Sequence, residues 1–360
     1  MALKAVHVTD VPSLTKVPEK VTFSGGVETA SFVVVGHRGH GMNLLPSPDP
    51  SFPTFLENSI SSFNAAAKFP IHFVEFDVQV TSDGCPVIFH DNFICSEENG
   101  VVYEKRVTEL SLEEFRSYGG QKEKERKGKP LMRKTKEGKI VKWSIDSDDD
   151  PLCTLQEAFQ EVDPVLGFNI ELKFDDNLVY SHDHLSRLLR PILQVVSDHA
   201  KDRPIIFSSF QPDAALLVRK LQTSYPVFFL TNGGTEIYKD ERRNSLEEAI
   251  KLSEEGGFQG IVSEVKAIFR NPAAVTIIKQ SNLSLLTYGK LNNVVESVYM
   301  QHLMGVDGVI VDHVHEISHA VSRMIHDHDH DHDHPSKLKP RFSDKELSFL
   351  LKLIPQLIQH

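Results

Sequence analysis

The chain has 360 residues, of which 40% are hydrophobic and 25% are charged, and its formal net charge is −11 at neutral pH. Such a composition is typical of a globular protein with enough apolar residues for a large core. The acidic balance argues against a nucleic-acid-binding protein, whose surface would be basic. The three cysteines are too few for a disulfide framework and favour a reducing compartment. No apolar run approaches the roughly 18 residues of a membrane span, so we expect no transmembrane segment.

Residues 1–30 are expected to form an N-terminal extension without a secretory signal, because charged and polar residues interrupt its apolar stretches at Lys4, His7, Asp10 and Lys16. No arginine precedes Arg38, which matches a transit peptide poorly. A short or atypical transit peptide stays open. We therefore expect an intracellular protein, in the cytosol or a plastid, and not a secreted one.

Short apolar runs rich in strand-forming residues recur along the chain, at 32–36, 73–80, 167–174, 204–208, 227–231, 260–265, 284–288 and 308–312. Helical patterns lie between most of them, at 58–68, 178–199, 213–222, 245–255, 272–280 and 293–304. Strands that alternate with helices imply βαβ units and a parallel sheet. About eight repeats predict an α/β protein with a (β/α)₈ TIM barrel over residues 31–325. The alternative, a doubly wound open sheet, would require a phosphate loop that the sequence lacks.

A long insertion of about residues 93–152 follows the second strand region. Thr154 and Glu157 then form the pattern of a capping box at the start of a helix. Within the insertion, residues 121–142 hold ten Lys and Arg against three Glu, which is unusual in an acidic chain. Two interpretations stay open: a lid or surface that meets anionic lipid, and a solvated, mobile loop.

Two further segments follow the barrel. Residues 326–341 are a His/Asp-rich linker that contains HDHDHDHDHP, for which we expect a solvated segment, with loose metal binding as the alternative. Residues 342–360 predict an amphipathic helix with Ser343 as N-cap, Glu346 at the third position, and a staple between Phe342 and Leu347. Its apolar face is expected to pack on the barrel; the alternatives are a partner subunit, giving a homodimer, and a membrane surface.

Alternation along two of the strands brings carboxylates to one face. In FVEFDVQV, the apolar set faces outward and the polar set inward, the latter being Glu75, Asp77 and Gln79; in NIELKF, Glu171 and Lys173 share a face. These residues lie late in their strands, where barrels build active sites. Three acids against the two bases Arg38 and Lys173 leave an unpaired negative charge, which a divalent cation such as Mg²⁺ or Ca²⁺ would relieve. The alternative is a structural network neutralised by the two bases.

Two histidines end strand-like runs, His37 in FVVVGH and His90 in PVIFH. Imidazole titrates near neutral pH, so the pair is suited to general acid and base catalysis, although a lone histidine is more often structural. Arg38 offers a planar fork for phosphate oxygens. Gly39 and Gly41 are expected to let the backbone approach a ligand closely.

The motifs GHRG, ENSISSFNAA, VEFDVQVTSDGCPVIFHD, NIELK and DGVIVD, in this order over residues 33–312, resemble the glycerophosphodiester phosphodiesterase family. The insertion and the tail KELSFLLKLIPQLIQH resemble its plant intracellular branch. The resemblance implies a TIM barrel with these roles: acid–base catalysis by His37 and His90, phosphate binding by Arg38 and Lys173, and one Mg²⁺ or Ca²⁺ ion on Glu75, Asp77 and Glu171. Of the EN pair that opens the first helix, Asn58 is expected to cap the helix and Glu57 to support the site.

Many family members carry a tryptophan-containing stretch after the seventh strand, beside the glycerol. This sequence reads LLTYGKLNN there, so we expect Tyr288 to take part in substrate binding. The implied activity is metal-dependent hydrolysis of glycerophosphodiesters, such as glycerophosphocholine and glycerophosphoethanolamine, to sn-glycerol 3-phosphate and an alcohol. The alternatives are a lysophospholipase D or a phosphoinositide-type phosphodiesterase on the same barrel, and a catalytically silent headgroup- or metal-binding scaffold.

Overall fold

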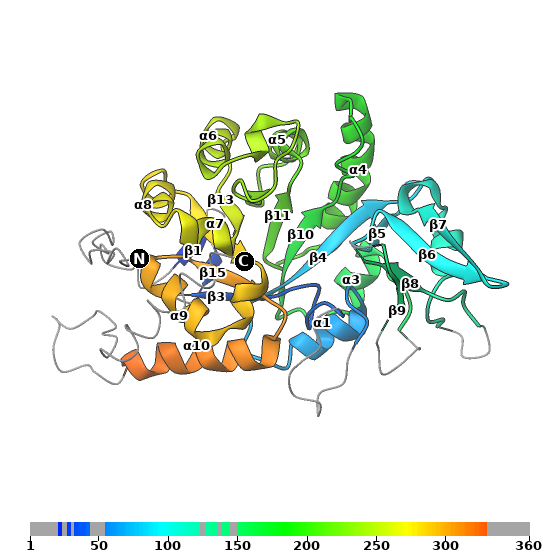
Figure 1. The fold of residues 1–360 in the computed structure, drawn as a ribbon, viewed down its shortest axis with the longest axis horizontal. Helices are drawn as coiled ribbons and strands as arrows, with labels where there is room; N and C mark the ends of the chain where they lie inside the picture. Colours follow the sequence, from blue (N-terminus) through cyan, green and yellow to red (C-terminus); the bar gives the residue numbers. More distant parts are fainter. Residues whose placement is uncertain are drawn as a thin grey trace, which may run out of the picture.

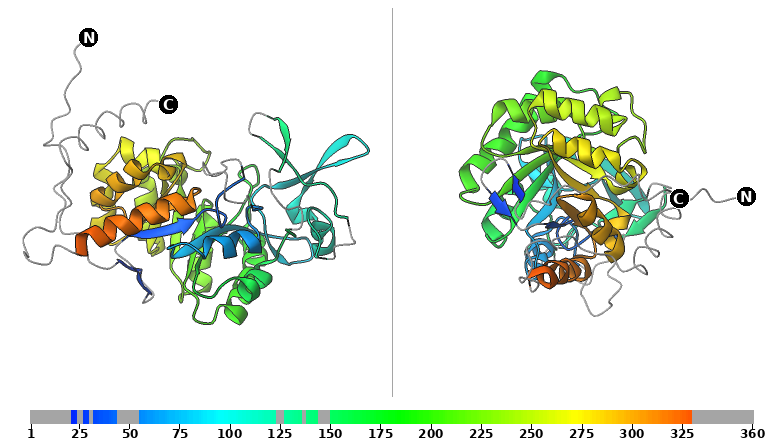
Figure 2. Two further views of the ribbon diagram at one scale, coloured as in Figure 1. Left: turned by 90° about the horizontal axis from the view of Figure 1, so that it is seen from below. Right: turned by 90° about the vertical axis from the view of Figure 1, so that its left-hand side faces the viewer.

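The computed structural model describes residues 21–23, 27–29, 32–43, 55–122, 127–135, 138–143 and 150–329. Parallel strands form a closed barrel in the order β10–β11–β12–β13–β14–β15–β3–β4, and β4 pairs back to β10 (Figures 1 and 2). Their bounds are β3 (Val33–Gly36), β4 (Phe73–Val80), β10 (Gly167–Leu172), β11 (Ile205–Ser209), β12 (Val227–Thr231), β13 (Gly260–Glu264), β14 (Ser284–Tyr288) and β15 (Gly308–Val311). The predicted TIM barrel is confirmed, with each strand within a few residues of its expected position.

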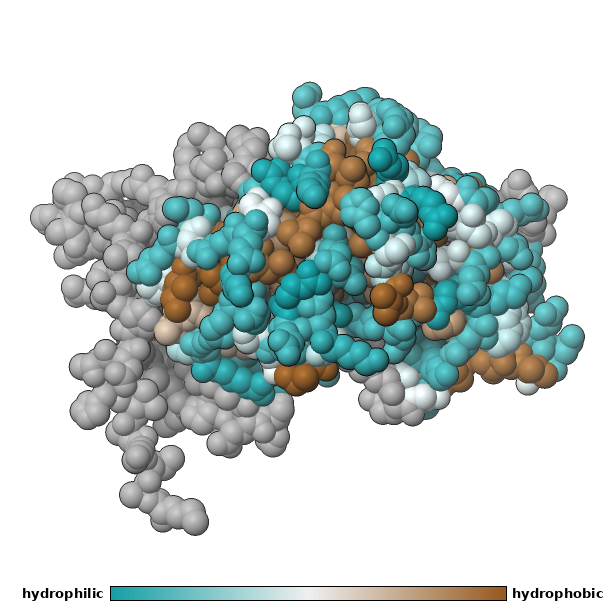
Figure 3. All heavy atoms as spheres, turned by 90° about the horizontal axis from the view of Figure 1, so that it is seen from above, coloured by the Kyte–Doolittle hydropathy of each residue, from teal (hydrophilic) through white to brown (hydrophobic). Residues whose placement is uncertain are grey.

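Helices surround the barrel, namely α1 (Ile60–Ala66), α3 (Leu155–Glu161), α4 (His182–His199), α5 (Pro212–Leu221), α6 (Leu246–Gly256), α7 (Val265–Arg270), α8 (Ala273–Gln280), α9 (Val295–Met304) and α10 (Val314–Asp329). The predicted capping box of Thr154 and Glu157 starts α3, with both of its hydrogen bonds present. The face formed by α4, α5 and α6 is mainly hydrophilic, with apolar side chains in narrow strips (Figure 3). These helices therefore bury one face on the barrel and present the other to solvent.

The barrel strands alternate between two apolar cores. On β4, Val74, Phe76 and Val78 belong to the cluster between barrel and helices, as the alternation predicts. Phe73 points the other way, into a second cluster that fills the barrel interior, together with Val33, Val35, Ile206, Phe228, Leu230, Val262, Leu286 and Ile310. The next inward positions of β4 are polar. The lower interior is therefore packed with apolar side chains, and the site lies above it at the carboxyl ends of the strands.

The insertion forms a small domain-like unit beside β4 (Figure 1). After β5 (Pro86–Ile88), which pairs antiparallel to β4, a four-stranded sheet has the order β7–β6–β8–β9. The strands of this sheet and the helix of the insertion are β6 (Phe93–Glu98), β7 (Val101–Arg106), α2 (Leu112–Arg116), β8 (Met132–Lys134) and β9 (Ile140–Lys142). A separate apolar cluster around Phe115 and Tyr118 holds it together. The sequence indicated only weak patterning here, because strands of three to six residues show little periodicity.

The chain ends are described in part. Strands β1 (Val21–Phe23) and β2 (Val27–Thr29) form an antiparallel hairpin in the N-terminal extension, which the sequence did not predict. Helix α10 continues to Asp329, so the first residues of the His/Asp tract are helical. The rest of that tract and the predicted helix 342–360 lie outside the described residues. None of the helices that the structure describes combines the length and apolar character needed to cross a membrane.

Candidate active site

Three carboxylates meet at the carboxyl end of the barrel. Glu75 and Asp77 are successive inward residues of β4, and the register of β4 with β10 sets Glu171 directly opposite Asp77. One oxygen of each carboxylate lies within 4.8 Å of the others, and all three residues are buried. Strand pairing alone therefore brings together the three acids that the sequence placed on one face.

Crowding and burial shift the pKa values of these acids apart. Burial, and next the charge of Asp77, raise the pKa of Glu75 to about 8. Burial also raises the pKa of Glu171, although Lys173 opposes it. Burial acts in the same direction on Asp77, but His90, Lys173 and Arg38 outweigh it and hold its pKa below the ordinary value. Buried carboxylates this close repel one another unless a cation or a proton lies between them.

The triad fits a hard divalent cation. Carboxylate oxygens are the ligands that Mg²⁺ and Ca²⁺ prefer, and the triad offers three of them at one point. Oε1 of Glu75 is buried and has no hydrogen-bond partner among the described residues. An unpartnered buried carboxylate oxygen is costly, and a divalent cation held by the triad would satisfy it.

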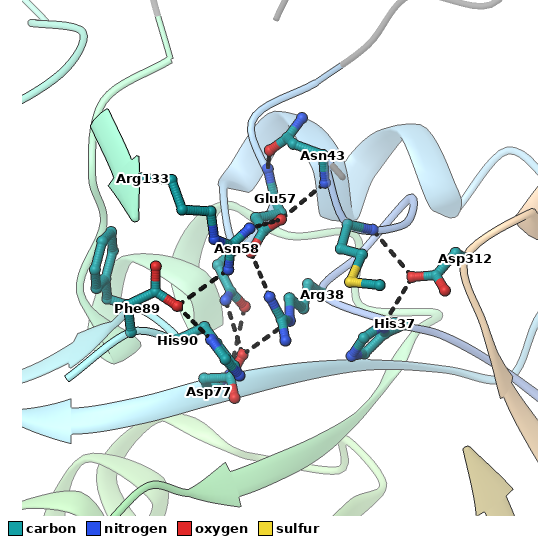
Figure 4. A network of polar contacts seen from close by, with 12 residues as sticks. His37, Arg38, Asn43, Glu57, Asn58, Asp77, Phe89, His90, Arg133 and Asp312 are labelled. Carbon is teal, nitrogen blue, oxygen red and sulfur yellow. Dashed lines mark hydrogen bonds and ion pairs between the residues drawn. The ribbon is translucent and has the colours of Figure 1, made fainter. Parts of the chain in front are cut away.

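His37 follows β3 and is oriented by an aspartate that follows the neighbouring strand β15, far away in sequence. Its Nδ1 lies 2.7 Å from Oδ1 of Asp312 (Figure 4). Its Nε2 lies 3.9 Å from Oε2 of Glu75. Asn293 holds Asp312 by a side-chain hydrogen bond of 2.9 Å. Burial is the largest influence and lowers the pKa of His37, but the charge of Asp312, its hydrogen bond and the charge of Glu75 together outweigh it, so the pKa is raised. An ionised aspartate only accepts hydrogen bonds, so Nδ1 carries a proton and Nε2 faces the triad.

His90 has a similar partner in its own neighbour. Its Nδ1 lies 2.7 Å from Oδ1 of Asp91. Gln79, the last inward residue of β4, donates from Nε2 to the carbonyls of both Phe89 and Asp91, at 2.7 and 2.9 Å. Burial, followed by the charges of Arg38 and Lys173, lowers the pKa of His90 well below its ordinary value. Gln79 thus places the histidine over the site by fixing the backbone on both sides of it.

Arg38 is held among carboxylates. Its NH1 donates to Oε1 of Glu57 at 2.5 Å, its Nε lies 3.5 Å from Oδ2 of Asp77, and its backbone N–H donates to Glu75 at 3.0 Å. Burial disfavours its charge, but these carboxylates raise its pKa above the ordinary value. Nε makes no hydrogen bond within the described part of the chain. A buried cation with a donor to spare is suited to an anionic ligand.

Lys173 and Tyr288 complete the predicted set. Nζ of Lys173 lies 2.9 Å from Glu171 and 3.6 Å from Asp77, so it flanks the triad. Tyr288 ends β14 on another wall of the same barrel mouth, where its hydroxyl contacts Asn232. Burial and next the charge of Glu264 raise its pKa well above the ordinary value. The structure therefore gathers seven of the eight predicted residues, namely the triad and four side chains around it, and places Tyr288 on a separate wall.

One expectation about the loop after β3 is wrong. Ser59, not Asn58, caps α1, because its side chain accepts from the N–H of Ser62. Asn58 instead has a positive φ of 60° and donates to Asp77 at 2.9 Å. The packing of the protein itself requires the glycines, and close approach of their backbone to a ligand stays a prediction. A Cβ on Gly39 would meet Oγ of Ser62 at 2.5 Å, and one on Gly41 would meet the carbonyl oxygen of Asp312 at 2.3 Å. The tight packing of this loop against α1 and Asp312 requires both.

Sequence reasoning missed three residues of the site. Asp312 closes the motif DGVIVD, and Asp91 directly follows His90, so both carried a signal as acids at strand ends near a histidine. Arg133 lies in the insertion and carried none, because one arginine cannot be singled out in a stretch with ten basic residues. It donates to both Glu57 and Asp91, at 3.0 and 3.1 Å.

Comparison with known proteins agrees with this site. Residues 37–316 match the model of the glycerophosphoryl diester phosphodiesterase family, a span that runs from His37 past Asp312. The chain belongs to this family. It is a glycerophosphodiester phosphodiesterase, and the predicted resemblance is confirmed.

Relatives and solved structures extend the match. The chloroplastic glycerophosphodiester phosphodiesterase GDPD1 of Arabidopsis thaliana is 69% identical over 363 residues and covers all of both chains. GDPD2 of the same plant is 62% identical over 378 residues, again over the full length of both. A phosphodiesterase from Oleispira antarctica, solved with the product sn-glycerol-3-phosphate, superposes with a TM-score of 0.57 at 19% identity, covering 81% of this chain and 96% of that one. That likeness supports the barrel fold of this phosphodiesterase.

Proposed function

We propose that this phosphodiesterase hydrolyses glycerophosphocholine, glycerophosphoethanolamine and similar diesters to sn-glycerol 3-phosphate and an alcohol, with His37 and His90 as the acid–base pair. In this proposal Arg38 and Lys173 hold the phosphate, and Glu75, Asp77 and Glu171 hold one Mg²⁺ or Ca²⁺ ion.

One observation carries the proposal: two buried polar atoms of the site lack a hydrogen bond among the described residues, Oε1 of Glu75 and Nε of Arg38. The first is an acceptor that a cation would satisfy, and the second is a donor that a phosphate oxygen would satisfy. Both belong to residues joined by the hydrogen bond from the Arg38 backbone to Glu75. A metal-bound phosphate diester would satisfy both atoms at one place.

The protein's own groups divide the work as follows. A divalent ion, when bound, supplies positive charge to the phosphoryl oxygens. Arg38 and Lys173 add charge from two sides and orient the diester. Each histidine has its Nδ1 occupied by an aspartate, which leaves Nε2 free to take or give a proton. Two such nitrogens are needed, one to take a proton from the attacking water or substrate hydroxyl and one to give a proton to the oxygen of the departing alcohol.

The wall at β14 favours a cationic headgroup. The rings of Tyr288 and Phe210 lie edge to face with centroids 5.9 Å apart, and Glu264 pairs in register with Tyr288. Aromatic faces and carboxylates attract quaternary and primary ammonium groups. The mouth would thus meet a zwitterionic substrate with cations after β3 and β10 and with acidic and aromatic groups at the ends of β13 and β14.

The decisive measurement is release of glycerol 3-phosphate from glycerophosphocholine before and after chelation. We expect chelation to abolish turnover, and Mg²⁺ or Ca²⁺ to restore it in the wild type but not in Glu75→Gln. Replacing the histidines of the tract 326–335 with glutamine is the matched control, and it should leave the metal requirement unchanged. Full turnover in a chelator would contradict the proposal, and so would faster cleavage of lysophospholipids than of glycerophosphocholine, which would point to a lysophospholipase D.

We also propose a plastid location. The support is the relative named chloroplastic, which matches this chain over its full length, including the N-terminal extension. Imaging of the chain fused at its C-terminus to a fluorescent protein tests this, and a uniform cytosolic signal would contradict it.

A further inference from the structure

Arg133 differs from the other basic residues of its stretch. Within the described part of residues 121–142, Lys122, Lys127, Lys129, Lys134 and Lys139 are exposed, whereas Arg133 is only 6% exposed. It lies in the middle of β8, between buried Met132 and exposed Lys134. Burying a guanidinium is costly unless carboxylates compensate its charge. A basic residue that only kept the insertion soluble would be exposed. The burial of Arg133 therefore needs another explanation.

The contacts of Arg133 reach the active site in two directions (Figure 4). Its NH2 donates to Oδ1 of Asp91 at 3.1 Å, and the same oxygen accepts from Nδ1 of His90. Its NH1 donates to Oε2 of Glu57 at 3.0 Å, and the other oxygen of Glu57 accepts from Arg38. The guanidinium of Arg133 therefore links Asp91, the partner of His90, to Glu57, the partner of Arg38.

Trp143 of the insertion packs against the guanidinium of Arg133. The guanidinium carbon lies 4.7 Å from the ring centroid of Trp143, and Trp143 belongs to the apolar cluster of the insertion. The planar fork stacks on the ring and spans two carboxylates at once, which the point charge of lysine cannot do. Glu57 is itself tied down by the backbone N–H of Asn43 at 2.8 Å.

We propose that Arg133 is a positioning residue of the active site, by which the insertion orients His90 through Asp91 and Arg38 through Glu57. Asp91 lies partly exposed at the rim, with 28% of its side chain accessible, and Arg133 donates to the same oxygen that pairs with His90. The insertion is thereby a working part of the active site. This inference rests on the proposed role of His90.

The insertion also offers a matched control. Arg106, at the end of β7, forms an ion pair with Asp175 and lies over the ring of Phe93 at 4.4 Å. It therefore attaches the insertion to the barrel in the same style, by stacking and by a carboxylate, without touching the partners of His90 or Arg38. A variant of Arg106 reports what attachment alone contributes.

The test uses the full chain with saturating metal and glycerophosphocholine. Arg133→Met should lower kcat roughly 10- to 100-fold, the range for groups that orient a functional histidine, whereas Arg106→Met should leave kcat unchanged. In a double-mutant cycle, Arg133→Met with Asp91→Asn should lower kcat little further than Arg133→Met alone, whereas Arg106→Met with Asp91→Asn should be additive. Wild-type kcat in Arg133→Met, or additivity with Asp91→Asn, would overturn the inference.

Two further variants keep the outcomes distinct. If Arg133→Met does not fold, Arg133→Lys decides: a folded enzyme with kcat still reduced supports the inference, and wild-type kcat overturns it. His90→Ala is measured in the same assay. Full turnover in His90→Ala means that the proposed function of His90 fails, whereas an inactive His90→Ala beside a fully active Arg133→Met means that only the role of Arg133 fails.

Discussion

His37 and His90 each place Nδ1 2.7 Å from an aspartate oxygen, yet the two pairs are built differently. Asp312 is 275 residues from His37 and 6% exposed, and it reaches the histidine only because β15 pairs with β3. Asp91 is the next residue after His90 and is 28% exposed. The first pair is made by closure of the barrel, and the second by a local contact that the insertion supports.

The surroundings of the two pairs shift the pKa values of the two histidines in opposite directions. Against the effect of burial, Asp312 raises the pKa of His37, whereas burial and the cations Arg38 and Lys173 lower that of His90. Identical short-range geometry therefore yields opposite shifts, because longer-range charges decide the balance. The comparison predicts that the barrel-made pair carries stability as well as orientation, and that the insertion-made pair carries orientation alone.

The largest effects are expected from variants that weaken the apolar core of the barrel or that of the insertion, one at a time. Phe76→Ala, in the core between barrel and helices, should cost about 3–5 kcal/mol in the free energy of unfolding. Phe115→Ala, in the core of the insertion, should change barrel unfolding less but lower kcat, because it loosens the support of Asp91. Chemical denaturation followed by near-UV circular dichroism, with kcat measured alongside, separates the two. Equal losses of barrel stability would show that barrel and insertion unfold as one unit.

Removing either histidine should break catalysis to a similar extent despite their different surroundings. His37→Ala and His90→Ala should each lower kcat on the order of 10²-fold or more, the usual scale for acid–base groups. Thermal unfolding should change little, since neither ring belongs to an apolar core. The measurement is steady-state turnover of glycerophosphocholine, with the melting temperature as control. A histidine whose alanine variant retains wild-type turnover has no part in acid–base catalysis.

A smaller effect should distinguish Asp312 from Asp91, namely the pH dependence of the free energy of unfolding when each is replaced. The pKa of His37 is raised in the fold, so its pairing stabilises fully below the ordinary value of 6.5 and is lost as pH rises through the raised value. The pKa of Asp312 is lowered, so its contribution is present above its ordinary value and is lost as pH falls. Asp312→Asn should therefore destabilise the metal-free protein most between about pH 4 and 6.5.

The measurement is urea denaturation across that range, with an NMR titration in which the pKa of His37 falls in Asp312→Asn. Asp91→Asn is the matched control and should show no such window in its unfolding free energy. If the two variants lose the same stability at every pH, the distinction between a barrel-made and an insertion-made pair does not hold.

The sequence alone determined the barrel and most of its site. Each β strand of the barrel is an apolar run of a few residues bounded by turns, and parallel strands separated by helices have few ways to pack. Alternation along FVEFDVQV was enough to place Glu75 and Asp77 inside, because the side-chain period of a strand is fixed by its backbone. The ends of the strands then carried His37 and His90 to one rim.

Only the tertiary structure decided which residues hold the side chains of the site in place. Asp312 reaches His37 by closure of the barrel, and Asn58 turns to Asp77 because a positive φ of 60° takes it out of the cap position that local pattern suggested. Arg133 comes from a three-residue strand whose register no periodicity reveals. These contacts depend on where distant segments meet, whereas the strands and their inward faces depend on local backbone geometry, which the order of residues specifies directly.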